Sequence, residues 1–212
     1  MQLNSVAVAP AAANLSAAVP SGAVVRILLA SSSPRRREIL SSLRLTFDVV
    51  HTNVDEALLP EEDPYEAAER LARAKAAAAG EQDGTLVIAA DTIVVLDGEA
   101  INKPESREDA RRMLRRLQGR GHDVVTGVAL RLGGRMVSSR EVSGVVFAPM
   151  TEDEIARYAA TGEPDDKAGA YALQGIGGVF VSSVEGSPSN VVGLPLRLLY
   201  ALAGELGVAL LP

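Results

Sequence analysis

The sequence predicts an α/β protein built on one mixed β-sheet. Apolar segments typical of strands alternate with segments of helical periodicity along most of the chain. Two pairs of strands are joined by short glycine-containing turns, which is typical of antiparallel hairpins. With 212 residues, of which 47% are hydrophobic, the chain can bury a substantial core as one domain or as two small lobes.

Composition excludes several classes of function. The net charge of −6 argues against a general binder of nucleic acid or of membrane surfaces. The sequence contains no cysteine, which excludes disulfides and thiolate metal sites. No apolar run approaches the roughly 18 residues that a membrane-spanning helix needs. We therefore expect a cytoplasmic protein with no nucleic-acid partner and no membrane contact.

The first residues do not fit a secretory signal. Met1 to Gly22 carries no Lys or Arg, and Pro10 and Asn14 interrupt its apolar character. We interpret residues 1–24 as a flexible N-terminal extension and residues 25–212 as a single domain.

The first predicted strand, Ile27–Ala30, leads directly into a predicted helix start. Ser31–Ser33 supplies an N-cap, and Pro34 stands at the first helical position, where its missing N–H costs nothing. Arg35–Arg37 then places three cations at the positive end of the helix dipole. This arrangement fits a phosphate site of forked guanidinium donors, or alternatively a capped helix whose arginines point into water.

The next segments contain candidates for metal or phosphate contacts. After a predicted strand at Leu45–Val50, Asp55 and Glu56 are either metal ligands or part of a solvated turn. A helix over residues 63–79 follows, and Lys75 lies on its apolar side. That lysine either extends its ammonium out to water or reaches into a cleft.

The most hydrophobic segment, Thr85–Leu96, predicts a central strand. Asp91 lies in its middle, and a carboxylate there is destabilising by several kcal/mol unless it is paired, hydrogen-bonded or bound to metal. We therefore assign Asp91 a catalytic or metal-binding role. Thr92 is expected on the opposite face of the sheet unless the strand ends or bulges there.

The second half of the chain continues the alternation. A hairpin turn at Asp97-Gly98 returns the chain to Lys103, which by default is exposed. The glycine-rich segment 163–178 allows close approach of a ligand, and Gln174 within it is either a reader of a base edge or an ordinary loop residue. The remaining predicted elements are a helix at Ser106–Leu117, strands at Val124–Leu132 and Met136–Ala148, a helix from Thr151 that stops at Gly162, a strand at 179–181 and a helix at Leu194–Leu206.

Six short motifs, in this order, resemble those of the Maf family of nucleoside triphosphate pyrophosphatases. The motifs are Ala30-Ser31-Ser32-Ser33-Pro34-Arg35-Arg36, Val54-Asp55-Glu56, Leu71-Ala72-Arg73-Ala74-Lys75-Ala76, Ala89-Ala90-Asp91-Thr92, Lys103-Pro104 and the segment from Asp166-Lys167 through Gln174-Gly175. They span residues 27 to about 200. The N-terminal extension and Arg37 depart from the family pattern without touching a motif position.

The resemblance implies an elongated mixed sheet in two α/β lobes with a central cleft, similar to inosine triphosphate pyrophosphatase. It implies hydrolysis of a nucleoside triphosphate to the monophosphate and pyrophosphate with Mg²⁺ or Mn²⁺. By resemblance Asp91 is the proton acceptor, Glu56 and Asp91 are metal ligands, and the phosphate contacts are Ser31, Arg35, Lys75 and Lys103. The residues that sort substrates in the family correspond to Arg36, Thr92 and Gln174, and all three match the branch acting on dTTP and UTP. The branch acting on 7-methyl-GTP carries a tryptophan, which this chain lacks.

Two other functions remain as alternatives. A phosphatase that forms an aspartyl-phosphate on Asp91 would want a second acid two residues later, where this chain has Ile93. A non-catalytic nucleotide-sensing regulator of cell division would have no reason to keep both carboxylates and both lysines. The expected partner is a small nucleotide, and a homodimer is compatible with the sequence.

Overall fold

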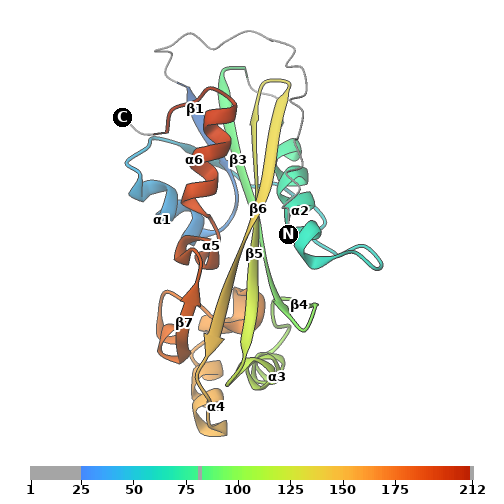
Figure 1. Cartoon of the computed structure of the whole chain (residues 1–212), viewed down its shortest axis with the longest axis vertical. Coiled ribbons are helices and arrows are strands. Elements are labelled where there is room, and N and C mark those ends of the chain that lie inside the picture. The colour runs from blue at the N-terminus through green and yellow to red at the C-terminus, as the bar shows by residue number, and fades with distance from the viewer. Residues whose placement is uncertain (1–24, 81–82, 211–212) are drawn as a thin grey trace, which may run out of the picture.

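The computed structural model describes residues 25–80 and 83–210, and the expected N-terminal extension lies outside them. The described residues form a seven-stranded sheet in the order β2-β1-β3-β5-β6-β7, with β4 paired to the far end of β3 (Figure 1). Its strands are β1 (Arg26–Ala30), β2 (Asp48–Val50), β3 (Thr85–Leu96), β4 (Glu99–Ile101), β5 (Gly121–Leu132), β6 (Arg135–Phe147) and β7 (Val181–Glu185).

The sheet is mixed, as the sequence predicts. Strand β1 runs parallel to β2 and β3, whereas β3, β4, β5, β6 and β7 pair antiparallel. The helices are α1 (Pro34–Ser42), α2 (Pro64–Ala78), α3 (Arg107–Leu117), α4 (Glu152–Ala160), α5 (Pro188–Val192) and α6 (Leu196–Glu205). Three 3₁₀ turns lie between α4 and β7, at Glu163–Asp166, Ala168–Ala170 and Ile176–Phe180.

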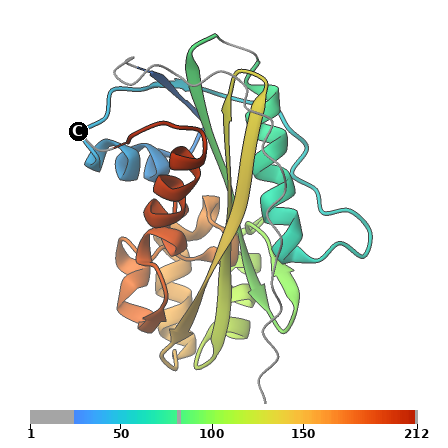
Figure 2. The same ribbon diagram turned by 45° about the horizontal axis from the view of Figure 1, so that its top comes forward.

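The molecule is elongated, and the long strands β3, β5 and β6 are shared by two lobes (Figure 1). In one lobe, α2 lies on one face of the sheet while α1 and α6 lie on the other, an arrangement that Figure 2 shows from a second side. Leu29, Leu40 and Leu199 are fully buried between α1, α6 and the sheet. In the other lobe, Leu114 and Tyr158 from α3 and α4 pack around Phe147.

Helix starts follow the predicted capping chemistry. The side chain of Ser33 caps α1, and those of Asp63 and Ser106 cap α2 and α3 by accepting backbone N–H groups. Thr151 and Glu154 form a complete capping box at α4. Four of the predicted helices therefore begin where the sequence places them.

Several predicted boundaries are wrong in detail. The strand expected at Leu45–Val50 covers only its last three residues, and β5 and β6 begin before the predicted Val124 and Met136. The segment 179–180 belongs to a 3₁₀ turn and not to a strand. The glycines before it allow the tight backbone conformation in which i→i+3 hydrogen bonds form. The final helix starts at Leu196, and the short helix α5, which the sequence analysis did not predict, precedes it.

One edge of β3 is left open between its two partners, and this gap positions the site described below. Strand β1 pairs with Thr85–Ala89, and β4 pairs with Val94–Leu96. Within residues 25–80 and 83–210, no strand pairs with residues 90–93 on that edge. Asp91 and Thr92 point to opposite faces of the strand, yet both reach the same cavity because the sheet is interrupted beside them.

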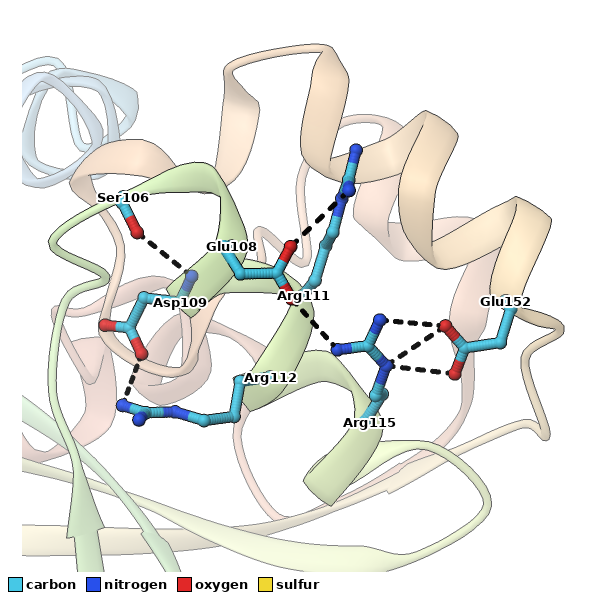
Figure 3. A network of polar contacts seen from close by, with 7 residues as sticks. All are labelled: Ser106, Glu108, Asp109, Arg111, Arg112, Arg115 and Glu152. Atoms are coloured by element: carbon cyan, nitrogen blue, oxygen red, sulfur yellow. Dashed lines mark hydrogen bonds and ion pairs between the residues drawn. The ribbon is translucent and has the colours of Figure 1, made fainter.

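Ion pairs on the surface connect the two helices of the second lobe (Figure 3). Arg115 of α3 donates to Glu152 of α4 at 2.9–3.0 Å and to Glu108 of its own helix at 3.3 Å. All three side chains are open to solvent, which screens the pairs, so they add little to the stability of the fold. The packing of the second lobe therefore depends mainly on its apolar core.

That core contains a buried histidine that should make stability depend on pH. His122 is 5% exposed, contacts the rings of Phe147 and Tyr171, and shares a 2.8 Å hydrogen bond with the Tyr171 hydroxyl. Burial lowers the pKa of His122 from 6.5 to about 4, against a weaker opposing effect of Asp123. Between these two pKa values, His122 is therefore neutral in the folded protein and protonated in the unfolded chain.

We expect His122 to leave the free energy of unfolding unchanged above pH 6.5 and to lower it as the pH drops toward 4. The difference in pKa corresponds to roughly 3 kcal/mol across that window. Urea unfolding of the native chain and of His122→Gln at pH 7.5 and 4.5 measures it. Part of the native loss comes from carboxylates and is common to both proteins, so the histidine contribution is the difference between them. Equal losses in the two proteins would contradict the assignment.

Candidate active site

A cavity of about 760 Å³ lies at the open edge of β3, between the end of β1 and the end of β4. It is lined by elements from both lobes, including the start of α1, helix α2 and the 3₁₀ segment after α4. The nine residues to which the family resemblance assigns a role all line this cavity: Ser31, Arg35, Arg36, Glu56, Lys75, Asp91, Thr92, Lys103 and Gln174. Asp55, the other candidate metal ligand, does not line it and is an exposed loop residue that accepts a hydrogen bond from the Ala57 N–H.

The charges around the cavity differ from those of the whole chain. Five cationic side chains and three carboxylates line it, a local net charge of +2 in a chain whose net charge is −6. The cations come from segments far apart in the sequence, and the fold brings them to one place. The cavity is therefore suited to a multiply charged anion.

On the α2 side of the strand, one lysine joins the two candidate acids. Lys75 Nζ lies 2.5 Å from Asp91 Oδ1 and 2.6 Å from Glu56 Oε1. Asp91 and Lys75 are both more than nine-tenths buried, whereas the side chain of Glu56 is half exposed. Lys103 Nζ is 3.6 Å from the second oxygen of Glu56. Lys75 therefore reaches into the cleft and does not extend its ammonium out to water.

The close approach of α2 makes the Lys75 contacts possible. The helix presents alanines to the sheet, and Ala67, Ala68, Ala72 and Ala76 are completely buried. Beneath Ala68 the paired strand has Gly127, opposite Asp91 in the β3–β5 register. With no side chain in the way, α2 lies low enough for Lys75, two helical turns further on, to reach the acid.

On the other face, Arg36 is held by protein atoms on three sides. Its Nε donates to the Gly193 carbonyl at 2.8 Å, and its Nη2 donates to Thr92 Oγ1 at 3.0 Å. Its Nη1 approaches Ser31 Oγ at 3.4 Å. Burial lowers the pKa of Arg36, and the charges of Asp91 and Glu56 oppose that effect. Arg36 thus does not point into water, which removes the alternative for this arginine.

Arg35 and Arg37 have different surroundings. Arg35 Nη1 lies 3.9 Å from Asp166 Oδ2, across the cavity on the second lobe. Asp166 also pairs with its neighbour Lys167 at 2.5 Å. Arg37 is exposed and does not line the cavity, so the alternative of an arginine in solvent holds there.

Gln174 sits on an exposed loop whose shape is set by a carboxylate. Glu163 accepts hydrogen bonds from the backbone N–H groups of Ile176 and Gly177 at 2.9 and 2.8 Å, and from the Tyr158 hydroxyl at 2.8 Å. Burial raises the pKa of Glu163, but these donors outweigh it and the net pKa is lowered. The carboxylate therefore stays charged and fixes the turn that follows Gln174.

The pKa of Glu56 shows which interaction dominates beside Lys75. Burial raises this pKa, but the hydrogen bond and charge of Lys75, together with the charges of Lys103 and Arg36, lower it by more, so the net pKa is lowered. Glu56 is thus ionised at neutral pH. Residues 25–80 and 83–210 contain no group of three or more His, Asp or Glu side chains arranged to hold a metal ion.

The sequence analysis missed the residues that support Arg36 and Thr92 from behind. Thr126, Asn190 and Gly193 form this support and do not line the cavity. Thr126 gives no signal in the sequence because a β-branched residue is ordinary in a strand. Asn190 gives none because it follows a proline in a segment that resembles a turn. The one available signal was Ser187-Pro188, which marks a helix start close to a buried amide.

Comparison with known proteins agrees with the motifs in the sequence. The model of the family described as "Maf-like protein" matches residues 26–206. A protein of Chromobacterium violaceum named dTTP/UTP pyrophosphatase is 47% identical, over 87% of this chain and 96% of its own length. Proteins of the same name from Anaeromyxobacter sp. and Escherichia coli O157:H7 are 53% and 46% identical, over 81% and 83% of this chain and 84% and 90% of theirs. The chain belongs to the Maf family.

Solved structures with similar folds include two Ham1 proteins. The Staphylococcus aureus protein has a TM-score of 0.44 and 18% identity, over 87% of this chain and 91% of that one. The Coxiella burnetii protein has a TM-score of 0.43 and 16% identity, over 60% of this chain and 75% of that one.

Within the described residues, every helix is too short or too polar to cross a membrane.

Proposed function

We propose that this protein is a nucleoside triphosphate pyrophosphatase that hydrolyses dTTP and UTP to the monophosphate and pyrophosphate. The observation that carries the proposal is the buried Asp91–Lys75 pair, open to a cavity where cations from both lobes converge. The names of its relatives support the substrate class.

The acid is placed to handle the proton of an attacking water. In the reaction, the water oxygen bonds to the α-phosphorus, the bond from that phosphorus to the bridging oxygen breaks, and pyrophosphate leaves. Asp91 accepts the proton of the water, and Lys75 fixes the orientation of the carboxylate that receives it. Arg35, Lys103 and the Ser31 hydroxyl line the cavity as donors for the phosphate oxygens.

The two carboxylates also suit a divalent metal. Mg²⁺ is commonly bound by one or two protein carboxylates together with substrate phosphates and water, and Glu56 and Asp91 offer two carboxylates that already share one cation. We propose these residues as the ligands of Mg²⁺ or Mn²⁺. Such an ion would neutralise charge on the triphosphate when bound.

The base would lie toward the other end of the cavity. Arg36, Thr92 and Gln174 line it and offer a guanidinium, a hydroxyl and an amide, which together can both donate and accept hydrogen bonds. We propose that these three residues select the pyrimidine base. Arg36 and Thr92 are held by hydrogen bonds, and polar groups held in this way reject a base whose donors and acceptors do not match.

The test is product analysis with the full chain. We incubate it with dTTP, UTP, CTP, dATP and GTP, with Mg²⁺, Mn²⁺ or EDTA, and identify the products by anion-exchange chromatography. The expected result is metal-dependent release of pyrophosphate and monophosphate from dTTP and UTP. Release of orthophosphate would instead favour a phosphatase. Tight binding of nucleotides without turnover would favour a nucleotide sensor.

A further inference from the structure

A buried chain of hydrogen bonds runs from the cavity into the sheet. Arg36 Nη2 donates to Thr92 Oγ1 at 3.0 Å, and Thr92 Oγ1 lies 2.9 Å from Thr126 Oγ1. Thr126 Oγ1 donates in turn to the backbone carbonyl of Asn190 at 3.0 Å. Thr126 and Asn190 are completely buried, and only the first two members of the chain line the cavity.

The groups at the two ends of this series of hydrogen bonds determine which atom donates in each of them. A guanidinium can only donate, and a carbonyl can only accept. The single hydroxyl proton of Thr126 goes to Asn190, because the carbonyl offers no proton of its own. Thr126 must therefore accept the proton of Thr92. The Thr92 hydroxyl then has no proton left and can meet a ligand only as an acceptor.

Asn190, the last member of this chain of hydrogen bonds, is itself held in place. Asn190 Nδ2 donates to the Val124 carbonyl and to Ser143 Oγ, each at 2.9 Å, which ties α5 to β5 and β6. Three residues later Gly193, with φ of +121°, turns its carbonyl toward Arg36. A Cβ at that glycine would come within 3.2 Å of Thr92 Oγ1. The carbonyl that receives the Thr126 proton is thus part of the same rigid support as Arg36.

We propose that Thr126 is a positioning residue for base selection: by taking the proton of Thr92, it makes that hydroxyl an obligate acceptor for the imide N–H of uracil or thymine. This inference rests on the proposed function. Uracil and thymine carry a ring N–H between two carbonyl oxygens, whereas cytosine has a lone pair at that ring nitrogen. A base placed with that ring nitrogen against Thr92 is accepted when it is an imide, while Arg36 donates to the neighbouring carbonyl.

The test compares two variants that differ by one hydroxyl. Thr126→Val keeps the shape of the side chain and removes the hydroxyl, and Thr126→Ser keeps the hydroxyl. The measured quantity is the ratio of kcat/KM for UTP to that for CTP. We expect Thr126→Val to lower this ratio at least tenfold, because Thr92 recovers a proton that it can donate to cytosine. Thr126→Ser should keep the native ratio within twofold.

Tyr65→Phe serves as the control for loss of a hydrogen bond elsewhere in the protein. It removes the hydroxyl that donates to Asp123 Oδ2 at 2.6 Å, and Tyr65 neither lines the cavity nor contacts Arg36, Thr92, Thr126 or Asn190 through a hydrogen bond, so the variant should leave the UTP/CTP ratio unchanged. If Thr126→Val lowers both kcat/KM values equally and keeps their ratio, Thr126 has only a structural role and the inference is overturned.

A second arm changes the substrate instead of the protein, so it decides the matter even if Thr126→Val does not fold. UTP methylated at the ring nitrogen lacks the imide proton, and the native enzyme should use it at least a hundredfold less well than UTP. Equal use of the two would overturn the inference. A native protein that releases no pyrophosphate from UTP would instead refute the proposed function, whereas equal release from UTP and CTP would refute only the role of Thr126.

Discussion

Asp91→Asn is expected to lose at least a hundredfold in kcat while keeping the native fold. General acid–base catalysis contributes about 10²–10⁴ to rate, and the amide cannot accept a proton from water. The amide oxygen still accepts a hydrogen bond from Lys75, which also keeps its 2.6 Å contact with Glu56. The amide weakens this hydrogen bond without removing it, so the free energy of unfolding should fall by no more than about 1.5–3 kcal/mol, the value of one hydrogen bond to a charged group.

The matched control is Asp97→Asn, the same chemical change in the turn that follows β3. Asp97 is exposed, pairs with Arg120 at 2.7 Å, and has a φ of +55°, which asparagine tolerates. This variant should keep native kcat and stability within about 0.5 kcal/mol, as surface substitutions usually do. Pyrophosphate release and urea unfolding measure both quantities. An active Asp91→Asn enzyme would refute the assignment of Asp91 as proton acceptor.

Among the residues that line the cavity, Asp91 and the arginines at the start of α1 stood out from the sequence because their chemistry conflicts with their position. A carboxylate in the middle of an aliphatic strand and arginines at the positive end of a helix each need a partner, and the cavity supplies one for Asp91 and Arg36. The helix caps were predictable for a related reason, since Ser, Asp and Thr at those positions satisfy N–H groups within three residues.

The support behind the cavity was not predictable, because it depends on strand register. Thr126 meets Thr92 only because antiparallel pairing places them opposite each other in β3 and β5. Asn190 is further away in the sequence, and its role follows from where α5 settles on β5 and β6. No local pattern encodes which of several buried hydroxyls and amides will meet.

Gly127→Ala is expected to damage both stability and activity, although the glycine lies outside the cavity. A methyl carbon there would overlap the Ala68 carbonyl group and lie 2.5 Å from the Glu69 Cα. Overpacking of a core usually costs about 1–3 kcal/mol, and here the neighbours are backbone atoms of α2 that have no rotamer to change. We expect a loss of at least about 3 kcal/mol in the free energy of unfolding, measured by urea.

The same clash should separate the catalytic pair. To relieve it, α2 has to move away from the sheet, and Lys75 moves with the helix while Asp91 stays on β3. A displacement of about 1 Å can cost a hundredfold in rate, so kcat should fall by that order in the fraction that remains folded.

Gly134→Ala provides the control, because that glycine lies in the β5–β6 turn and a Cβ there has open space and no strained backbone angle. It should leave kcat and the unfolding midpoint unchanged. If Gly127→Ala behaved in the same way, the close approach of α2 would not be what brings Lys75 to the acid. The geometry of the pair would then have to be set from the other side of the cavity, by Glu56 and its loop.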